Sequence, residues 1–147
     1  MTRGMRGAGR LQGLTAIRKV IRSGGNPIGE PSSVLIRRDA AIAAGCFRTD
    51  SPYVIDVDMW IRMLSLGDLY VLPQVLSEYR VSGGSWSVDA AHRQSSDYRD
   101  LVNYVRSSAR YGVTWADARL GVIRGAMNAR LRRLFYALFV REGGGVS

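Results

Sequence analysis

The run from Asp50 to Gly67, DSPYVIDVDMWIRMLSLG, constrains the fold more than any other part of the sequence. Most of it is apolar, and its spacing predicts a largely buried helix from about Val57 to Leu66. Asp56 and Asp58 stand at the start of that helix. One interpretation is structural: Asp56 caps the helix, and Asp58 favours its positive end. The other is that one of these carboxylates performs chemistry.

Length and composition predict one globular domain. With 147 residues and 46% hydrophobic content, the chain is long enough for a single core. Its one cysteine, Cys46, has no disulfide partner, so we expect a small buried residue in a reducing compartment. We find no targeting signal, and no apolar run approaches the roughly 20 residues that cross a bilayer. The sequence therefore predicts a cytoplasmic protein, with peripheral attachment to the inner face of the membrane as an option.

The net charge of +9 is concentrated at the two ends of the chain. Residues 1–22 carry six basic residues and no acid, residues 23–105 carry seven basic and ten acidic, and residues 106–147 carry eight basic and two acidic. Basic ends suit an anionic membrane surface, a phosphorylated substrate or a nucleic acid. The sequence has no aromatic-interleaved basic motif, zinc-finger spacing or helix-turn-helix pattern, which disfavours a nucleic-acid partner.

Periodicity and turn residues predict the remaining elements. We expect residues 1–13, rich in Gly and Arg, to be disordered or poorly packed. Thr114 and Asp117 have the spacing of a capping box. Within the central helix, Arg62 is expected to seek a carboxylate or a backbone carbonyl. Helices are expected over 14–22, 39–44, 57–66, 88–111 and 114–141, strands over 33–36, 69–72 and 75–81, and loops over 26–31 and 82–87.

The last helix has an apolar stripe with two interpretations. Such a stripe usually belongs to the protein's own core, which we therefore predict. Its arginines, Arg130, Arg132 and Arg133, also suit an interfacial helix on an anionic lipid surface. The stripe consists of Trp115, Val122, Ile123, Met127, Leu131, Leu134, Phe135 and Leu138.

Four short motifs occur in an order typical of one enzyme family. They are PSSVLIRR at 31–38, AGCF at 44–47, IDVDMWIR at 55–62 and VLSEYR at 75–80. Together they resemble the acceptor-side half of family 2 glycosyltransferases of the GT-A type. In that family a Pro-Ser strand ending in Arg precedes Gly-Gly-Phe, Glu-Asp-x-Asp-Leu-Trp-x-Arg and a strand ending in Leu-x-x-Tyr-Arg. The resemblance covers residues 26–87.

The resemblance implies an α/β fold, a partial GT-A-like half with a helical C-terminal extension. Residues 1–25 would form a basic, partly disordered lead-in with a short helix, residues 26–87 the acceptor and catalytic half, and residues 88–147 the C-terminal helices. The implied activity is inverting transfer of a sugar from a nucleotide-sugar donor to a hydroxyl of a carbohydrate or lipid-linked acceptor.

The family's general base aligns with Asp56. A hydroxyl is a poor nucleophile, so a nearby carboxylate must take its proton as the anomeric carbon is attacked. Asp58, Trp60 and Arg62 match residues that bind or orient the acceptor end, with Trp60 and Arg62 also serving packing and ion pairing. The 82–87 loop, through its backbone N–H groups, suits an anion.

Arg80, Ser82 and Ser85 are accordingly expected near the donor phosphates. The family also implies a divalent metal, Mn or Mg, whose ligands would lie in an upstream half. Asp56-Val57-Asp58 matches the bare Asp-x-Asp metal pattern, but the neighbouring motifs identify the catalytic segment instead. Asp58 remains the alternative metal ligand.

The sequence departs from the family at three points. Ile55 replaces the usual Glu, and Ser82 stands where many members have His. The nucleotide-binding half would need roughly 100 further residues upstream. We therefore expect a fragment, a degenerate remnant or one half of a split enzyme.

The alternative hypothesis is a non-catalytic basic module that docks on a membrane or an acidic protein. The lone histidine, His92, is expected on the surface.

Overall fold

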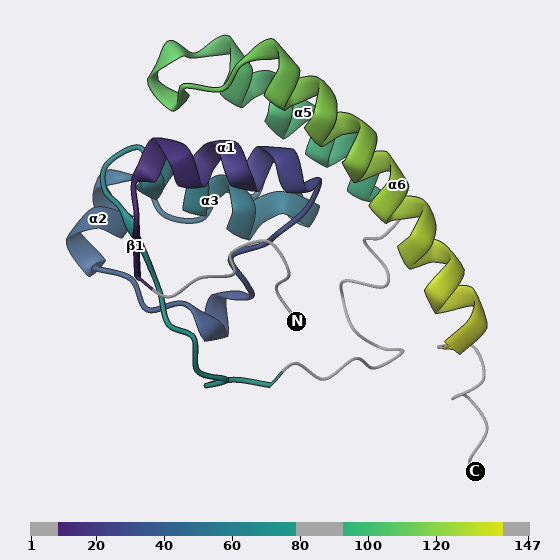
Figure 1. Cartoon of the computed structure of the whole chain (residues 1–147), viewed down its shortest axis with the longest axis horizontal. Coiled ribbons are helices and arrows are strands. Elements are labelled where there is room, and N and C mark those ends of the chain that lie inside the picture. The colour runs from purple at the N-terminus through teal and green to yellow at the C-terminus, as the bar shows by residue number, and fades with distance from the viewer. Residues whose placement is uncertain (1–8, 79–92, 140–147) are drawn as a thin grey trace.

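A computed structural model describes residues 9–78 and 93–139, and these residues are mostly helical (Figure 1). Two short strands and several single turns connect the helices. In chain order the elements are β1 (Gly9–Leu11), α1 (Gly13–Ser23), the 3-10 turn η1 (Pro31–Ser33), α2 (Arg38–Ala43), the 3-10 turn η2 (Pro52–Val54), α3 (Ile55–Leu64), β2 (Leu69–Val71), α5 (Gln94–Ser107), the 3-10 turn η4 (Ala109–Tyr111) and α6 (Trp115–Phe139).

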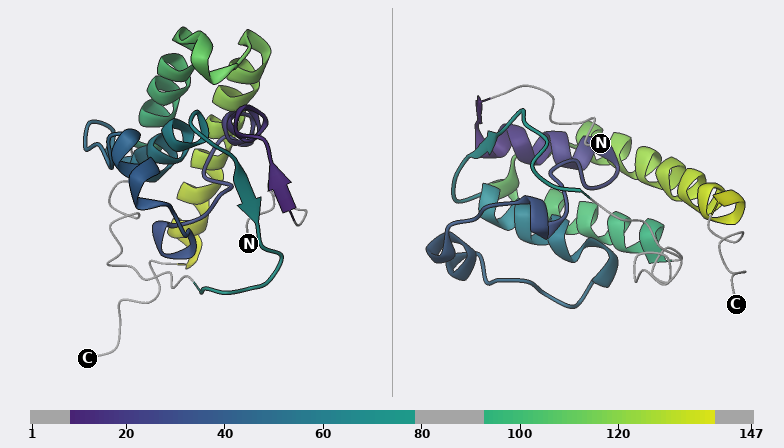
Figure 2. Two further views of the ribbon diagram at one scale, coloured as in Figure 1. Left: turned by 90° about the vertical axis from the view of Figure 1, so that its left-hand side faces the viewer. Right: turned by 90° about the horizontal axis from the view of Figure 1, so that it is seen from below.

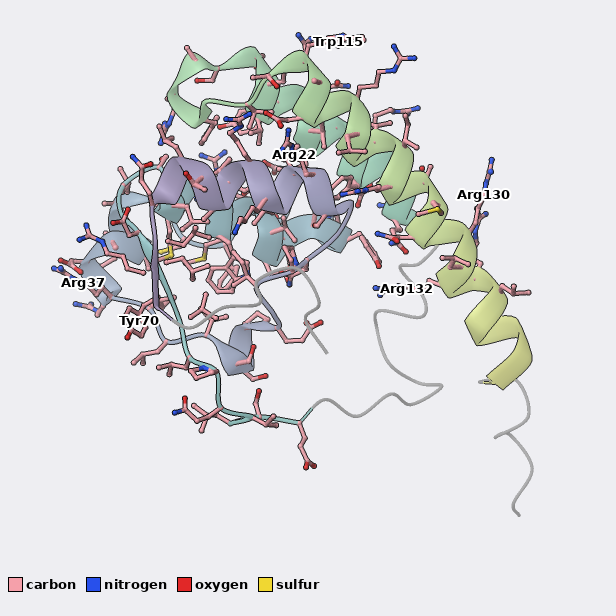
Figure 3. All side chains as sticks on the ribbon, viewed as in Figure 1. Arg22, Arg37, Tyr70, Trp115, Arg130 and Arg132 are labelled. Atoms are coloured by element: carbon pink, nitrogen blue, oxygen red, sulfur yellow. The ribbon has the colours of Figure 1, made fainter. Side chains whose placement is uncertain are left out.

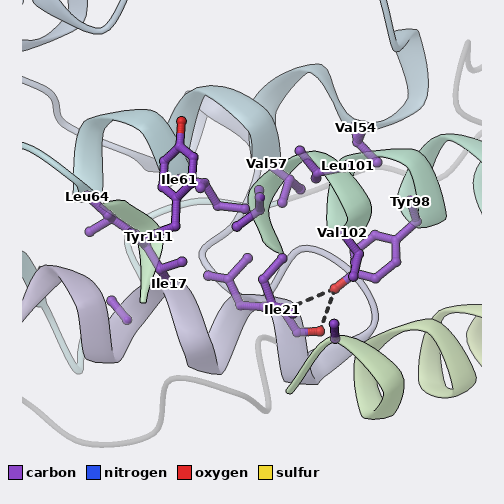
Figure 4. Packing of buried hydrophobic residues seen from close by; sticks show 14 residues of the cluster. Ile17, Ile21, Val54, Val57, Ile61, Leu64, Tyr98, Leu101, Val102 and Tyr111 are labelled. Atoms are coloured by element: carbon purple, nitrogen blue, oxygen red, sulfur yellow. Dashed lines mark hydrogen bonds between the residues drawn. The ribbon is translucent and has the colours of Figure 1, made fainter. Parts of the chain in front are cut away.

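Four helices, α1, α3, α5 and α6, enclose the main core. Helix α1 contacts both α3 and α6, and α5 packs along α6 (Figure 2). Ile17, Val20 and Ile21 of α1 are fully buried because they recur at helical spacing on one face. The Tyr98 hydroxyl of α5 donates to the Ile21 carbonyl at 2.7 Å and to that of Val20 at 3.1 Å (Figure 4). This hydroxyl therefore satisfies carbonyls at the free C-terminal end of α1.

Helix α6 approaches its neighbours through small residues. The side of α6 that faces the other helices is buried and consists of Asp117, Ala118, Gly121, Gly125 and Ala129. A Cβ atom on Gly121 would lie only 2.3 Å from the Ile21 carbonyl oxygen. Large side chains cannot occupy this face, so the large apolar residues of the helix point elsewhere.

The buried Asp117 fastens the start of α6 to α1. Its carboxylate pairs with Arg18 at 2.9 Å and with Arg22 at 2.5 Å, and its side chain is 0% exposed. The predicted capping box is confirmed: the Thr114 N–H donates to the Asp117 carboxylate at 3.0 Å, and the Asp117 N–H donates to the Thr114 hydroxyl at 3.2 Å. Burial alone would raise the pKa of Asp117, but hydrogen bonds from Thr114 and Arg18 lower it to about 2.

The predicted α/β, GT-A-like fold is wrong for the described residues. Their sheet is one antiparallel pair, in which Gly9, Arg10 and Leu11 of β1 face Val71, Tyr70 and Leu69 of β2. Strands were expected over 33–36 and 75–81. Ser33 instead ends the 3-10 turn η1, and residues 34–36 and 75–78 have no strand partner in the parts described. A β-branched apolar run becomes a strand only when a neighbour completes its hydrogen bonds, and the sequence pattern cannot supply that neighbour.

Two local predictions are also corrected. Residues 9–11, expected to be poorly packed, form β1, because Asp68 binds Arg10 at 2.6 Å and accepts from the Gly13 N–H at 2.9 Å. Cys46, expected to be buried, is exposed, and its φ of 52° follows Gly45 in a sharp turn after α2. The predicted helices at 14–22 and 57–66 and the strand at 69–72 are confirmed with small shifts of their ends.

The apolar stripe of α6 was predicted to be core, and for its outer members this is wrong. Ile123, Met127, Leu131 and Leu134 are between 52% and 58% exposed. The small residues described above form the inner face in their place, and periodicity does not distinguish these two faces. Among residues 9–78 and 93–139, no helix is long and apolar enough to cross a bilayer.

Candidate functional site

Asp56 lies in the first turn of α3 and is partly buried. Its Oδ2 accepts from the Asn26 amide at 2.7 Å, and its Oδ1 accepts from the backbone N–H of Val57 at 2.7 Å. The N-cap position of α3 belongs to Val54, so Asp56 is not the capping residue. Burial raises the pKa of Asp56, and the nearby charge of Glu30 adds to this, against the opposing effect of the two hydrogen bonds.

Asn26, which sequence reasoning missed, holds the Asp56 carboxylate in place. Its own side-chain oxygen accepts from the N–H groups of Ile28 and Gly29, each at 3.1 Å, and its amide also donates to the Gly29 carbonyl at 2.8 Å. These bonds form an Asx-type turn, which fixes the direction of the amide toward Asp56. The available signal was the Asn-Pro-Ile-Gly sequence, which indicated the turn but not its long-range partner.

Asp58 is turned to another partner. Its Oδ2 accepts from Arg62 Nε at 2.9 Å and from a terminal guanidinium nitrogen at 2.7 Å. The side chain of Arg62 is only 3% exposed, and it also donates to the carbonyls of Ala44 and Cys46. The expectation that Arg62 would seek a carboxylate or a carbonyl is confirmed, since it binds both and ties the turn after α2 to α3.

Trp60 is buried one turn after Asp56. It packs with Ala41 and Met59 in a second apolar cluster, and its ring meets that of Phe47 edge-on at a centroid distance of 6.0 Å. Its indole N–H points to the Gly29 carbonyl at 3.4 Å. The packing role predicted for Trp60 is confirmed, and a role in acceptor orientation stays a prediction for Trp60, Arg62 and Asp58.

An open hollow of about 2200 Å³ lies beside this site. Its walls include the loop 23–30 with Asn26, the ring of Trp60, the extended segment 69–78, and Arg124 and Asn128 of α6. Asp56 does not line the hollow, but it is hydrogen-bonded to Asn26, which does line it. Asp58 lies instead in a separate pocket of about 300 Å³ with Asp50, Arg48 and Tyr104 among its walls.

The two carboxylates of the Asp-x-Asp pattern therefore face different surroundings. Asp58 does not fit a metal ligand, because both of its hydrogen bonds go to the buried guanidinium of Arg62, which already balances its charge. Within the described ranges, no group of three or more His, Cys, Asp or Glu side chains could hold a metal ion. Residues 9–78 and 93–139 thus supply no ligand set for the expected Mn or Mg.

The expected donor-phosphate residues fall outside the described part of the chain. Arg80, Ser82 and Ser85, as well as His92, belong to residues 79–92, so their placement stays a prediction. The site that the structure does describe consists of Asp56, Asn26 and the start of α3.

Comparison with known proteins identifies one relative with a significant match. No family model matches the chain, and no solved structure matches it. A protein of Mycobacterium tuberculosis (strain CDC 1551 / Oshkosh), named uncharacterized protein MT1568, is 34% identical over 110 residues. The match covers 67% of this chain and 34% of the relative, so the chain spans about a third of the length of that protein. Its name states no activity.

Proposed function

We propose that this chain is the acceptor-side part of an inverting glycosyltransferase in which Asp56 is the general base. The observation that carries the proposal is the state of Asp56: a partly buried carboxylate with a raised pKa, held in place by Asn26 beside a large hollow. A raised pKa makes a carboxylate a stronger base, which suits removal of a proton from an attacking hydroxyl.

The surroundings of the two aspartates support different roles for them. Asp58 is ion-paired with a buried arginine and holds the fold together, so it is not free to accept a proton from a substrate. Asp56 is bound only by neutral donors, an amide and a backbone N–H, among the hydrogen bonds of the described chain. Its lone pairs can therefore receive a hydroxyl proton without breaking an ion pair.

The substrates follow from the proposed reaction. The donor is a nucleotide sugar, and the acceptor is a hydroxyl of a carbohydrate or of a lipid-linked glycan. Donor binding and the divalent Mn or Mg would be provided by polypeptide beyond the motifs of this sequence, whether on the same chain or on another. The relative, of which the match covers only about a third, is consistent with such an arrangement.

The first test separates chemistry from folding with the variant Asp56→Asn. A chimera in which this chain replaces the matching third of the mycobacterial relative is supplied with UDP-, GDP- and TDP-sugars, Mn or Mg, and membrane or glycan acceptors. We expect transfer with one donor class, and a loss of about 10²–10⁴-fold for Asp56→Asn, the usual contribution of a general base. Asp100→Asn removes an exposed carboxylate that does not line the hollow, so it serves as the matched control and should keep most of the activity.

Stability of the isolated chain provides the second readout. Because the folded pKa of Asp56 is raised, ionisation of this residue destabilises the fold, so stability rises as pH falls through that pKa. Asp56→Asn should therefore lack this pH dependence. Because Asn has one accepting oxygen where Asp56 uses two, toward Asn26 and the Val57 N–H, the variant should lose about 1 kcal/mol of unfolding free energy at pH 7 but remain folded. Transfer retained by Asp56→Asn, or no transfer by either the chimera or the relative with any donor, would contradict the proposal.

A further inference from the structure

The outer side of α6 carries a continuous row of large apolar side chains. Ile123, Met127, Leu131 and Leu134 are spaced by four, four and three residues, so they align along one face over roughly 16 Å of helix. Each is more than half exposed, and Trp115 at the beginning of the helix is 63% exposed. We call these five residues the outer stripe. A surface of this kind on a protein usually marks an interaction site.

The helix presents this stripe at the edge of the molecule. Figures 1 and 2 show the second half of α6 extending beyond α1, α3 and α5, with no described segment over its outer side. Its inner face is already used, since Gly121 and Gly125 lie against α1 and Tyr98 of α5. The outer stripe is therefore not a misplaced part of the core but a second apolar face on the same helix.

The charge around the outer stripe has one sign. Between Ala118 and Phe139 the sequence has five arginines and no acidic residue. Arg119 precedes Ile123 by four residues, and Arg130 follows Met127 by three, so both share the face of the stripe. Arg119 also lies over the Trp115 ring at 5.1 Å. Figure 3 shows Trp115 and Arg130 pointing away from the body, whereas Arg132 points toward it.

Asp117, the acidic residue within α6, does not offset that charge at the surface. Asp117 is fully buried and is paired with Arg18 and Arg22 of α1. A second copy of the chain placed on the stripe would bring two sets of arginines together without acidic partners, which charge repulsion disfavours. An anionic surface with an apolar interior matches both properties of the stripe at once.

We infer that α6 is a membrane-docking helix that lies in the plane of an anionic lipid surface. The outer stripe enters the boundary between headgroups and acyl chains, and Arg119 and Arg130 contact the lipid phosphates. The arginine stems are long enough to keep their charged ends at headgroup level while the helix is partly immersed. The interaction depends on the α6 surface alone and does not rest on the activity proposed for Asp56.

Vesicle flotation of the 147-residue chain tests this inference. The probe is phosphatidylcholine vesicles with or without about 30% phosphatidylglycerol, at low and high salt. We expect binding only to the anionic vesicles, and weaker binding at high salt. The triple variant Ile123→Gln, Met127→Gln, Leu131→Gln should lower the affinity at least about tenfold while keeping the parental melting temperature, because all three side chains are exposed.

A matched pair of charge variants separates α6 from the general basicity of the chain. Arg119→Gln with Arg130→Gln should lower the affinity about tenfold or more, whereas Arg38→Gln with Arg106→Gln removes the same charge from exposed sites elsewhere and should change it little. Equal losses for both pairs would overturn the inference, as would absence of vesicle binding by the folded parent. If the chain binds polyglutamate but not vesicles, and the triple variant binds polyglutamate as well as the parent does, the partner is an acidic protein instead. A dimer that the triple variant dissociates would assign the stripe to a second copy.

Discussion

Replacing Asp117 by Asn should test whether the junction of α1 and α6 rests on a buried charge. The carboxylate is fully buried, and its pKa lies at about 2 against an ordinary value of 3.8. At about 1.4 kcal/mol per pH unit, this lowering of the pKa corresponds to roughly 2–3 kcal/mol of stability above pH 4. Asn keeps the shape and one acceptor but not the charge that faces Arg18 and Arg22.

The direction of the pH effect follows from the lowered pKa. Stability from Asp117 is fully present above the unfolded pKa and is lost as pH falls toward the folded pKa of about 2. Roughly half of it should be gone by pH 3, which lies near the middle of that interval. The Asn variant should be less stable than the parent by roughly 2–3 kcal/mol at pH 7, with a smaller difference at pH 3.

Urea unfolding followed by circular dichroism at pH 7, 5.5 and 3 measures these quantities. Asp100→Asn is the control, because that carboxylate is 67% exposed and its pair with Arg99 spans 3.9 Å, so its loss should change stability by less than about 0.5 kcal/mol. The reasoning is refuted if Asp117→Asn unfolds with the parental free energy at pH 7, or if it keeps the parental dependence on pH between 5.5 and 3.

Two further substitutions test the packing. Gly121→Ala should destabilise the chain by about 1–3 kcal/mol in urea unfolding, despite the better helix propensity of Ala, because the new Cβ would meet the Ile21 carbonyl. Gly67→Ala is the control and should be close to neutral, since the space around its Cβ position is open. An equal effect of both substitutions would contradict the close approach of α6 to α1. Arg62→Gln should lower the free energy of unfolding by about 3–5 kcal/mol, because it leaves Asp58 and two backbone carbonyls without their buried partner. Thermal or urea unfolding measures this change. A decrease of less than about 1 kcal/mol would show that this network does not hold α2 to α3.

The sequence correctly predicted those features that depend only on residues close together in the chain. The helix that contains Asp56 and Asp58, the helix stopped by Gly24, and the capping box of Thr114 and Asp117 all follow from periodicity and turn chemistry within a few residues. The identification of Asp56 as the candidate base also came from the sequence, through its neighbours in the central motif. Its partner Asn26, 30 residues earlier, did not, because no local pattern specifies a contact over that separation.

The tertiary structure decided which predicted segments found partners. Residues 33–36 and 75–78 have the composition of strands. A strand exists only where another segment completes its hydrogen bonds, however, and within the described chain only β1 and β2 do so. Helix α6 makes the same point for burial. Its sequence offers two apolar faces, one small and one large, and the close approach to Ile21 and Tyr98 selects the small one. The amino-acid pattern thus determined that α6 is a helix, whereas packing alone decided that its large side chains face outward.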